Sequence, residues 1–236
     1  MITYVIILVA VILVGIPTIF LVNKNPKLRL PIQAFFAILI VVLSYLLVIN
    51  INKPIKFERE MKLRSNATIE KLMDIRTIQG SFKDKYGKYT GSFDTLISFV
   101  ASDSLAIENI VAVGEWNQDE MTKAEALKEG ILKKTEILIP VKDSLWNDKE
   151  YAIEEIRYIP FTNNVEFTMG AGEIETASKV KVKVFECYTT YLDLLNGLDK
   201  QMIANYIDTR TKYGAFEGIK VGSLVEATNN AGNWEK

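Results

Sequence analysis

Two long stretches without any charged residue stand near the start of this chain and constrain its fold more than any other feature. The first covers residues 2–22 and the second residues 32–49. A helix that crosses the hydrocarbon core of a bilayer needs about 20 apolar residues, so the first stretch is long enough and the second is near the lower limit unless Leu30 and Ile51 extend it. A buried core hairpin is the alternative. Two charge-free stretches of this length favour a two-helix transmembrane hairpin over residues 1–52.

The charged residues beside these stretches leave the orientation open. The linker 23–31 carries three basic residues, and the positive-inside rule places such a linker in the cytoplasm. Five more basic residues follow the second stretch within the range that the rule counts, and they favour the opposite orientation: Lys53, Lys56, Arg59, Lys62 and Arg64. No basic residue precedes residues 2–22, which disfavours a cleaved signal peptide.

A helical pattern begins after Pro54 and continues to about Lys85. Apolar residues recur at helical rather than alternating spacing through residues 69–86. The more polar part, residues 53–65, is expected to form a juxtamembrane helical stalk. Residues 66–236 are expected to form one extramembrane α+β domain that begins with the second half of this helix.

The stretch that follows the long helix predicts a tight turn and a second helix. Gly87 is placed to end the long helix, because glycine adopts the left-handed conformation that helix C-termini often use. Ser92 is placed to cap a short helix from Phe93 to about Val100. We expect the aromatic and apolar side chains here to form a structural corner. The alternative is a partner-contact site over the same residues, which are Tyr86, Gly87, Tyr89, Phe93 and Leu96.

Downstream, the pattern changes from helical to strand-like. Thr122 and Glu125 form a predicted capping box, and Gly130 ends the short helix that follows. About four strands of one mostly antiparallel sheet are then expected, within residues 131–145, 151–161, 165–176 and 180–186. Residues 190–210 favour a helix, with a strand left open, and residues 223–228 favour a short helical turn. The predicted fold is thus a membrane hairpin plus an α+β domain, with a long N-terminal helix packed on a small sheet.

No residue pattern indicates catalysis. The chain has no histidine and one cysteine, Cys187, which is expected to be a buried apolar residue at the end of a strand. Glu154 and Glu155 are adjacent, so on a strand they face opposite sides and do not form an acid/base pair. The sequence Gly170-Ala171-Gly172 is read as a hairpin turn or bulge rather than a metal or phosphate loop. We therefore expect a protein that is not an enzyme and has no cofactor.

Charge excludes one class of partner. All 29 acidic residues lie after residue 52, so the extramembrane part is slightly acidic and shows no basic stripe. Nucleic acid is therefore not an expected partner. The expected partners are the lipid bilayer and other protein subunits, with a homo-oligomer possible.

The segment TIEKLMDIRTIQGSFKDKYGKYTGSFDTLISFV (68–100) resembles the segment after the membrane helix in type IV pilin-like proteins and type II secretion pseudopilins. In those proteins a long helix ends in an aromatic residue, followed by a GxY turn and a short apolar helix. The chain also resembles an uncharacterised bacterial membrane-anchored family that carries this segment together with AGEIET and VKVKVFE regions. That family supplies no activity.

The pilin resemblance implies a bacterial inner-membrane protein whose C-terminal domain is periplasmic and whose partners are other membrane or periplasmic protein subunits. Pilins have one membrane helix, with a glutamate just inside it. This chain has two apolar stretches and no acidic residue before Glu58, so it is not expected to be processed or to polymerise as a pilin. The first functional hypothesis is a non-enzymatic structural or assembly component of a secretion or pilus-like apparatus. The alternative is a membrane-tethered ligand-sensing or binding module.

Overall fold

The computed structural model describes residues 29–117 and 121–235 and divides the chain into two compact units, Met1–Glu58 and Arg59–Lys236. Helix α2 (Arg29–Tyr86) is the first described element. Within the described residues it is the one helix whose length and composition suit a membrane crossing, and its most apolar window is not buried against protein. The other predicted span, residues 2–22, lies outside the described residues.

Helix α2 passes through Pro54, so the predicted helix start after this proline is wrong. A proline inside a helix removes one hydrogen bond, the one to the carbonyl of Asn50. The long helical segments on both sides keep the helix intact despite this loss. The predicted stalk also needs correction, because Arg64 belongs to the folded unit: its guanidinium donates to the carbonyls of Leu194 and Asn196, both at 3.0 Å.

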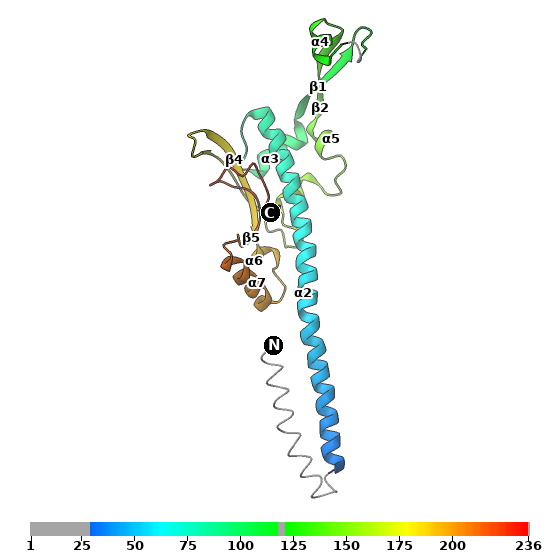
Figure 1. The fold of residues 1–236 in the computed structure, drawn as a ribbon, viewed down its shortest axis with the longest axis vertical. Helices are drawn as coiled ribbons and strands as arrows, with labels where there is room; N and C mark the ends of the chain where they lie inside the picture. The colour runs from blue at the N-terminus through cyan, green and yellow to red at the C-terminus, as the bar shows by residue number, and fades with distance from the viewer. Residues whose placement is uncertain (1–28, 118–120, 236) are drawn as a thin grey trace. The chain divides into compact units, whose positions relative to one another are not determined.

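The unit Arg59–Lys236 is an α+β fold with two small antiparallel sheets, not the single sheet that the sequence predicted (Figure 1). Strands β1 and β2 form a two-stranded ribbon, and the second sheet has the order β3-β4-β5. In chain order the elements after α2 are α3 (Phe93–Ser102), β1 (Ser104–Ala112), α4 (Lys123–Lys128), β2 (Leu132–Pro140), α5 (Val141–Leu145), the 3-10 helix η2 (Ile153–Arg157), β3 (Thr168–Glu175), β4 (Lys181–Thr190), α6 (Tyr191–Leu194), α7 (Lys200–Lys212) and β5 (Gly218–Gly222).

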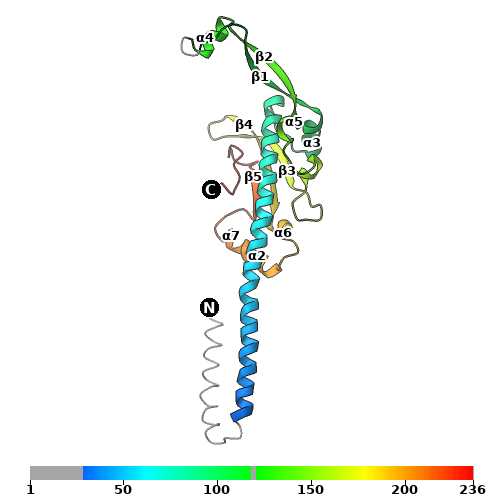
Figure 2. The same cartoon turned by 90° about the vertical axis from the view of Figure 1, so that its right-hand side faces the viewer.

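The core of this unit lies between the second half of α2 and one face of the three-stranded sheet (Figures 1 and 2). Leu72, Ile75 and Ile78 of α2 are fully or almost fully buried, as helical spacing predicts for a core-facing stripe. Phe185 on β4 is also fully buried and lies 5.0 Å from the ring of Tyr89, measured between ring centroids. This contact holds the turn after α2 against β4.

One predicted strand is a 3-10 helix. Residues 151–161 contain η2 and a single bridge between Tyr158 and Glu166 rather than a strand. The reason is visible in the sequence: Ile153, Ile156 and Ile159 recur every third residue, and all three are buried. A period of three places side chains on one face of a 3-10 helix, whereas a strand requires a period of two.

The predicted turn at Gly170-Ala171-Gly172 is also wrong, because these residues lie inside β3 in regular register with β4. The glycines serve close packing instead. A Cβ atom on Gly170 would lie 3.0 Å from the Cδ1 atom of Leu224. A side chain there would therefore displace Leu224 from the face of the strand.

The remaining predictions have mixed outcomes. The helical reading of residues 190–210 is confirmed by α6 and α7, with a turn at Gly197 (φ 89°) between them. The helical turn predicted for residues 223–228 is absent: they form bends, in which the Ser223 hydroxyl accepts from the main-chain N–H groups of Val225 and Glu226. The capping box of Thr122 and Glu125 is confirmed.

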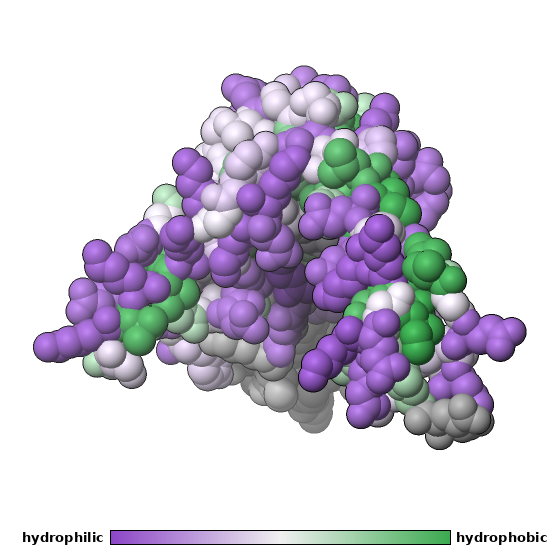
Figure 3. Space-filling view, turned by 90° about the horizontal axis from the view of Figure 1, so that it is seen from above, coloured by the Kyte–Doolittle hydropathy of each residue, from purple (hydrophilic) through white to green (hydrophobic). Residues whose placement is uncertain are grey.

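Among the described residues, no second layer covers the β1–β2 ribbon along much of its length. Its register pairs Ile107 with Ile137 and Ala106 with Leu138. The exposed fractions of Ile107, Ile137 and Leu138 are 41%, 45% and 70%. Figure 3 views the side of the molecule on which β1, β2 and α4 lie and shows apolar side chains at the surface among hydrophilic ones.

Candidate functional site

The turn at the end of α2 forms as the sequence predicted. Gly87 has a φ of 68°, the left-handed conformation, and its N–H donates to the carbonyl of Lys83 at 2.7 Å. Ser92 is the N-cap of α3, and its hydroxyl accepts from the N–H of Thr95 at 3.5 Å. The chain therefore reverses within the few residues between α2 and α3.

The predicted corner residues divide into two groups. Tyr89, Phe93 and Leu96 are buried, with exposed fractions of 8%, 8% and 0%. Tyr86 is not part of this buried group, because 49% of it is exposed. Its ring packs against the buried Phe82, with 4.7 Å between ring centroids, and forms the rim of the corner.

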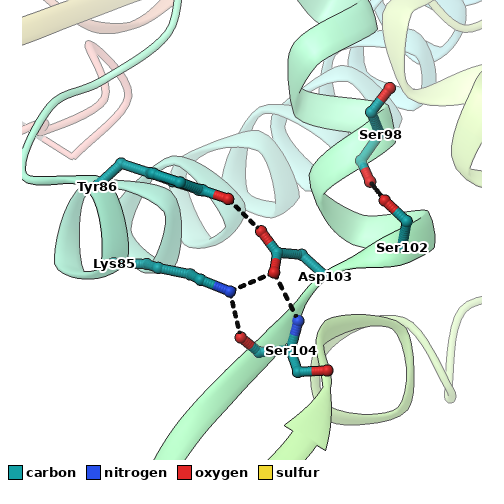
Figure 4. A network of polar contacts seen from close by, with 6 residues as sticks. All are labelled: Lys85, Tyr86, Ser98, Ser102, Asp103 and Ser104. Carbon is teal, nitrogen blue, oxygen red and sulfur yellow. Dashed lines mark hydrogen bonds and ion pairs between the residues drawn. The ribbon is translucent and has the colours of Figure 1, made fainter.

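A polar network holds Tyr86 in place (Figure 4). The Tyr86 hydroxyl and the Lys85 ammonium both donate to the carboxylate of Asp103, and Lys85 also donates to the carbonyl of Ser104 at 2.7 Å. The hydrogen bond from Lys85 is the main cause that lowers the pKa of Asp103, and the one from Tyr86 adds to it. The same bond to Asp103 raises the pKa of Tyr86. Asp103 is thus ionised at neutral pH and anchors the rim.

A groove opens beside the corner. It has a volume of about 810 Å³ and runs between the end of α2, the 88–91 turn and α3 on one side and the strands β3 and β4 on the other. Four aromatic residues line it, Phe82, Tyr86, Tyr89 and Phe99, and of these four Tyr86 is the exposed one. Hydroxyl groups come from the turn and from α3, where Ser102 donates to the carbonyl of Ser98 (Figure 4). The sheet contributes Ala171, Gly172, Glu173 and Lys183.

The charges of the groove are unevenly compensated. Asp103 is paired with Lys85, and Glu173 lies 3.8 Å from the ammonium of Lys181. Lys183 donates to the neutral carbonyl of Gly87 at 2.6 Å. Within the described residues, neither Lys88 nor Lys183 has a carboxylate at ion-pair distance. The uncompensated charge of the groove is therefore positive.

Sequence reasoning found the turn but missed the other wall of the groove. Asp103 follows α3 directly, and Lys183 lies about 100 residues beyond the turn in the sequence. The one available signal for Lys183 was the alternation of valine and lysine in residues 180–184, which marks a strand with one lysine-bearing face. Nothing in that alternation indicates which element the lysines meet.

Other candidate groups are structural. Cys187 is fully buried, and burial raises the pKa of its thiol, so it is not a thiolate nucleophile at neutral pH. In the described part of the chain, no three acidic, cysteine or histidine side chains converge in a way that would hold a metal ion. Trp146 is buried, and its indole N–H donates to the carbonyl of Tyr151 at 3.0 Å.

Comparison with protein-family models, with curated proteins and with solved structures finds no match for this chain.

Proposed function

We propose that this chain is a non-enzymatic component of a bacterial secretion or pilus-like apparatus, anchored in the inner membrane and acting through protein–protein contacts of its extramembrane unit. One observation carries the proposal. Helix α2 supplies both an exposed apolar stretch of membrane-spanning length and the buried stripe of the α+β unit, at Leu72, Ile75 and Ile78. An anchor that continues into the core of a domain suits a fixed scaffold better than a tethered, freely diffusing enzyme.

The proposed topology has two membrane spans, residues 2–22 and the apolar part of α2, with the C-terminal unit in the periplasm. The composition of residues 2–22 and the positive charge of the linker 23–31 support it. The resemblance of residues 68–100 to pilin-like proteins supports the periplasmic side, because those domains lie outside the inner membrane.

Exposed apolar residues on the β1–β2 ribbon support the role in protein contacts. A two-stranded ribbon is marginally stable alone in water, and this one exposes isoleucine and leucine along both of its faces. Surfaces of this kind are typical of sites that bind other proteins.

The topology can be tested by cysteine labelling, because Cys187 is buried and stays silent in the native protein. Single cysteines are introduced at Lys27 and at Lys212, which is exposed at the end of α7. A membrane-impermeant maleimide should label Lys212→Cys once the outer membrane is opened, and Lys27→Cys only after the inner membrane is permeabilised. The reverse pattern would place the extramembrane unit in the cytoplasm. Extraction of the full chain by alkaline carbonate would refute the anchor.

The protein contacts can be tested with a photo-crosslinking amino acid at Ile107 or Leu138 in intact cells. We expect discrete cross-linked species from the ribbon positions. The same label at the exposed Thr209 of α7 serves as the control and should give none. If the ribbon positions gave no more cross-links than the control, the ribbon would not be a contact surface.

Ligand binding is the second candidate, and the groove beside Tyr86 favours it. A volume of about 810 Å³ lies in the range of small-molecule sites, and aromatic and polar groups converge there. A thermal-shift screen of anionic metabolites on the full chain tests this candidate. Stabilisation that disappears in Lys183→Gln would support ligand binding over a scaffold role.

A further inference from the structure

The outer edges of the three-stranded sheet differ. The edge of β5 is covered by the chain itself: the N–H of Lys220 donates to the side-chain oxygen of Asn233 at 3.1 Å, and its carbonyl accepts from the N–H of Asn233 at 3.0 Å. A bridge between Val221 and Gly232 extends this cover. The other edge of the sheet is β3, and the groove opens along it.

The cover on β5 fixes which residues of β3 face outward. In an antiparallel sheet, successive residues of a strand direct their main-chain groups to opposite sides. The main-chain groups of Lys220 point away from β4, so the main-chain groups of its neighbour Val221 point toward β4. Val221 pairs there with Cys187. Cys187 therefore directs its main-chain groups to β5, and the even-numbered residues of β4 direct theirs to β3.

The same alternation identifies the free groups of β3. Val184 of β4 faces β3, where it pairs with Gly172. Gly172 is thus bonded within the sheet, and its neighbours Ala171 and Glu173 point their N–H and carbonyl groups outward. Both residues line the groove. No hydrogen bond from any other described residue reaches these outward groups.

The turn after α2 lies against this edge at Ala171. A Cβ atom on Gly91 would lie 3.1 Å from the main-chain nitrogen of Ala171. Glycine therefore lets the turn form a wall of the groove, whereas a larger residue at position 91 would press on the outward N–H of Ala171. The edge at Glu173 is open.

We propose that the β3 edge in this groove binds an extended, acidic segment of a partner protein, which adds to the sheet as a further strand. Unpaired edge groups supply the hydrogen bonds for strand addition. The exposed ring of Tyr86, which lines the groove, supplies a contact for apolar side chains of the segment. The positive charge of Lys88 and Lys183 selects acidic residues or a terminal carboxylate. The inference rests on the proposed function, because it states the chemistry of one protein partner.

The matched variants follow from the strand geometry. Glu173→Pro removes an outward N–H but no bond within the sheet, so the sheet is retained. Glu108→Pro makes the same change on β1. Two hydrogen bonds show which residues of β1 are bonded to β2: the N–H of Val113 donates to the carbonyl of Ile131, and the N–H of Val141 donates to the carbonyl of Asp103. The odd-numbered residues of β1 therefore bond to β2. The main-chain groups of Glu108, an even-numbered residue, point away from β2. Glu173→Gln keeps the N–H and controls for the lost charge.

The experiment selects a phage-displayed library of random nine-residue peptides on the full chain in lipid nanodiscs. We expect recovered peptides to alternate apolar and polar residues, to be rich in Asp and Glu, and to bind at least 10-fold more weakly to Glu173→Pro. The affinity for Glu108→Pro should stay within about 2-fold of wild type, and Glu173→Gln, which keeps the N–H but removes a negative charge from the groove, should bind the acidic peptides at least as tightly as wild type. Lys183→Gln should lower the affinity for the acidic peptides and reduce the dependence of that affinity on salt concentration.

Several outcomes would overturn the inference. These are recovery of no binding peptide, equal binding to Glu173→Pro and wild type, or a preference for basic peptides. Self-association of the full chain that Glu173→Pro abolishes would identify a second copy as the occupant instead. The cross-linking experiment at Ile107 and Leu138 tests the β1–β2 ribbon, which is a different surface. A negative result at the β3 edge would therefore not contradict the proposed function.

Discussion

Gln79 and Thr90 form a reciprocal pair of hydrogen bonds that ties the turn to the long helix. The Gln79 side-chain amide donates to the carbonyl of Thr90 at 2.6 Å, and the N–H of Thr90 donates back to the Gln79 side-chain oxygen at 3.1 Å. Gln79 is fully buried, and its amide also contacts the sulfur of Met169 on β3 at 3.3 Å. One side chain therefore connects α2, the turn and the sheet.

Replacing Gln79 should be costly. Gln79→Ala leaves both main-chain groups of Thr90 without partners in a part-buried site, and we expect a loss of about 2–4 kcal/mol in the free energy of unfolding. Gln201→Ala, at an exposed position of α7, is the control and should change stability by less than about 0.5 kcal/mol. Urea unfolding of the isolated unit Arg59–Lys236 measures both. A Gln79→Ala midpoint equal to that of the control would mean that the turn is held by other contacts.

The extramembrane unit should fold alone as a soluble, metal-free monomer or weak oligomer, and its stability should depend on where it starts. A fragment 66–236 lacks Arg64, whose two hydrogen bonds to the carbonyls of Leu194 and Asn196 are charge-assisted. Such bonds contribute about 1.5–3 kcal/mol to the free energy of unfolding. Their loss should lower the melting temperature of a domain of this size by about 3–10 °C. Differential scanning calorimetry of 59–236 and 66–236 provides the comparison. A melting temperature that falls on addition of a chelator would contradict the metal-free prediction.

Phe93 should be a structural residue rather than a partner contact. It is 8% exposed on the inner face of α3, and truncation of a buried aromatic residue costs about 3–5 kcal/mol. Tyr86→Ala should cost less, because 49% of Tyr86 is already exposed. Thermal unfolding of both variants shows which of them loses more stability. A near-wild-type midpoint for Phe93→Ala would make the corner a surface feature and a partner-site candidate.

Two glycines near the end of α2 should respond in opposite directions to the same change. Gly80 is inside the helix with open space around it, so Gly80→Ala should stabilise the fold by about 0.5–1 kcal/mol through helix propensity. Gly87 also has open space, but its φ of 68° is strained for alanine, so Gly87→Ala should cost about 1 kcal/mol. Because neither Cβ atom would meet another atom, the sign is set by the backbone alone. Equal shifts in the unfolding midpoint would contradict this.

Local signals in the sequence predicted the turn well. Gly87, Ser92 and the Thr122–Glu125 capping box act over three or four residues, and each has the predicted role in the structure. The same is true of the buried stripe on α2, which depends only on helical spacing. These features are encoded by residues close together in the chain, so a single sequence suffices to read them.

The groove was not predictable in the same way. Its outward-facing edge at Ala171 and Glu173 depends on the register of three strands and on the cover that Asn233 places on β5. A shift of one residue in register would turn these main-chain groups inward, and no local pattern excludes that shift. The glycines of β3 favour a turn in the sequence, because glycine marks a turn more often than it marks a close approach by a side chain such as Leu224.

Acid should weaken the rim of the groove through Asp103. Hydrogen bonds from Lys85 and Tyr86 hold the pKa of Asp103 below its ordinary value in the folded state. The unfolded chain, with an ordinary carboxyl pKa near about 3.9, therefore binds more protons than the folded chain in this window. The stabilisation from Asp103 is fully present above about pH 4 and is lost as the pH falls through the lower, folded pKa. Stability should thus decline with decreasing pH below about 4.

Asp103→Asn isolates this contribution. The variant cannot ionise, so it should be less stable than wild type at pH 7 and should lose less stability than wild type between about pH 4 and pH 2. Asp84→Asn removes an exposed carboxylate that has no ion-pair partner among the described residues, and it is the control for the loss of one negative charge. Urea midpoints measured across this pH range make the comparison. If Asp103→Asn kept the full wild-type slope, the acid sensitivity would arise from other carboxylates, such as Glu235 beside Arg76, whose hydrogen bond also lowers the pKa of that carboxyl.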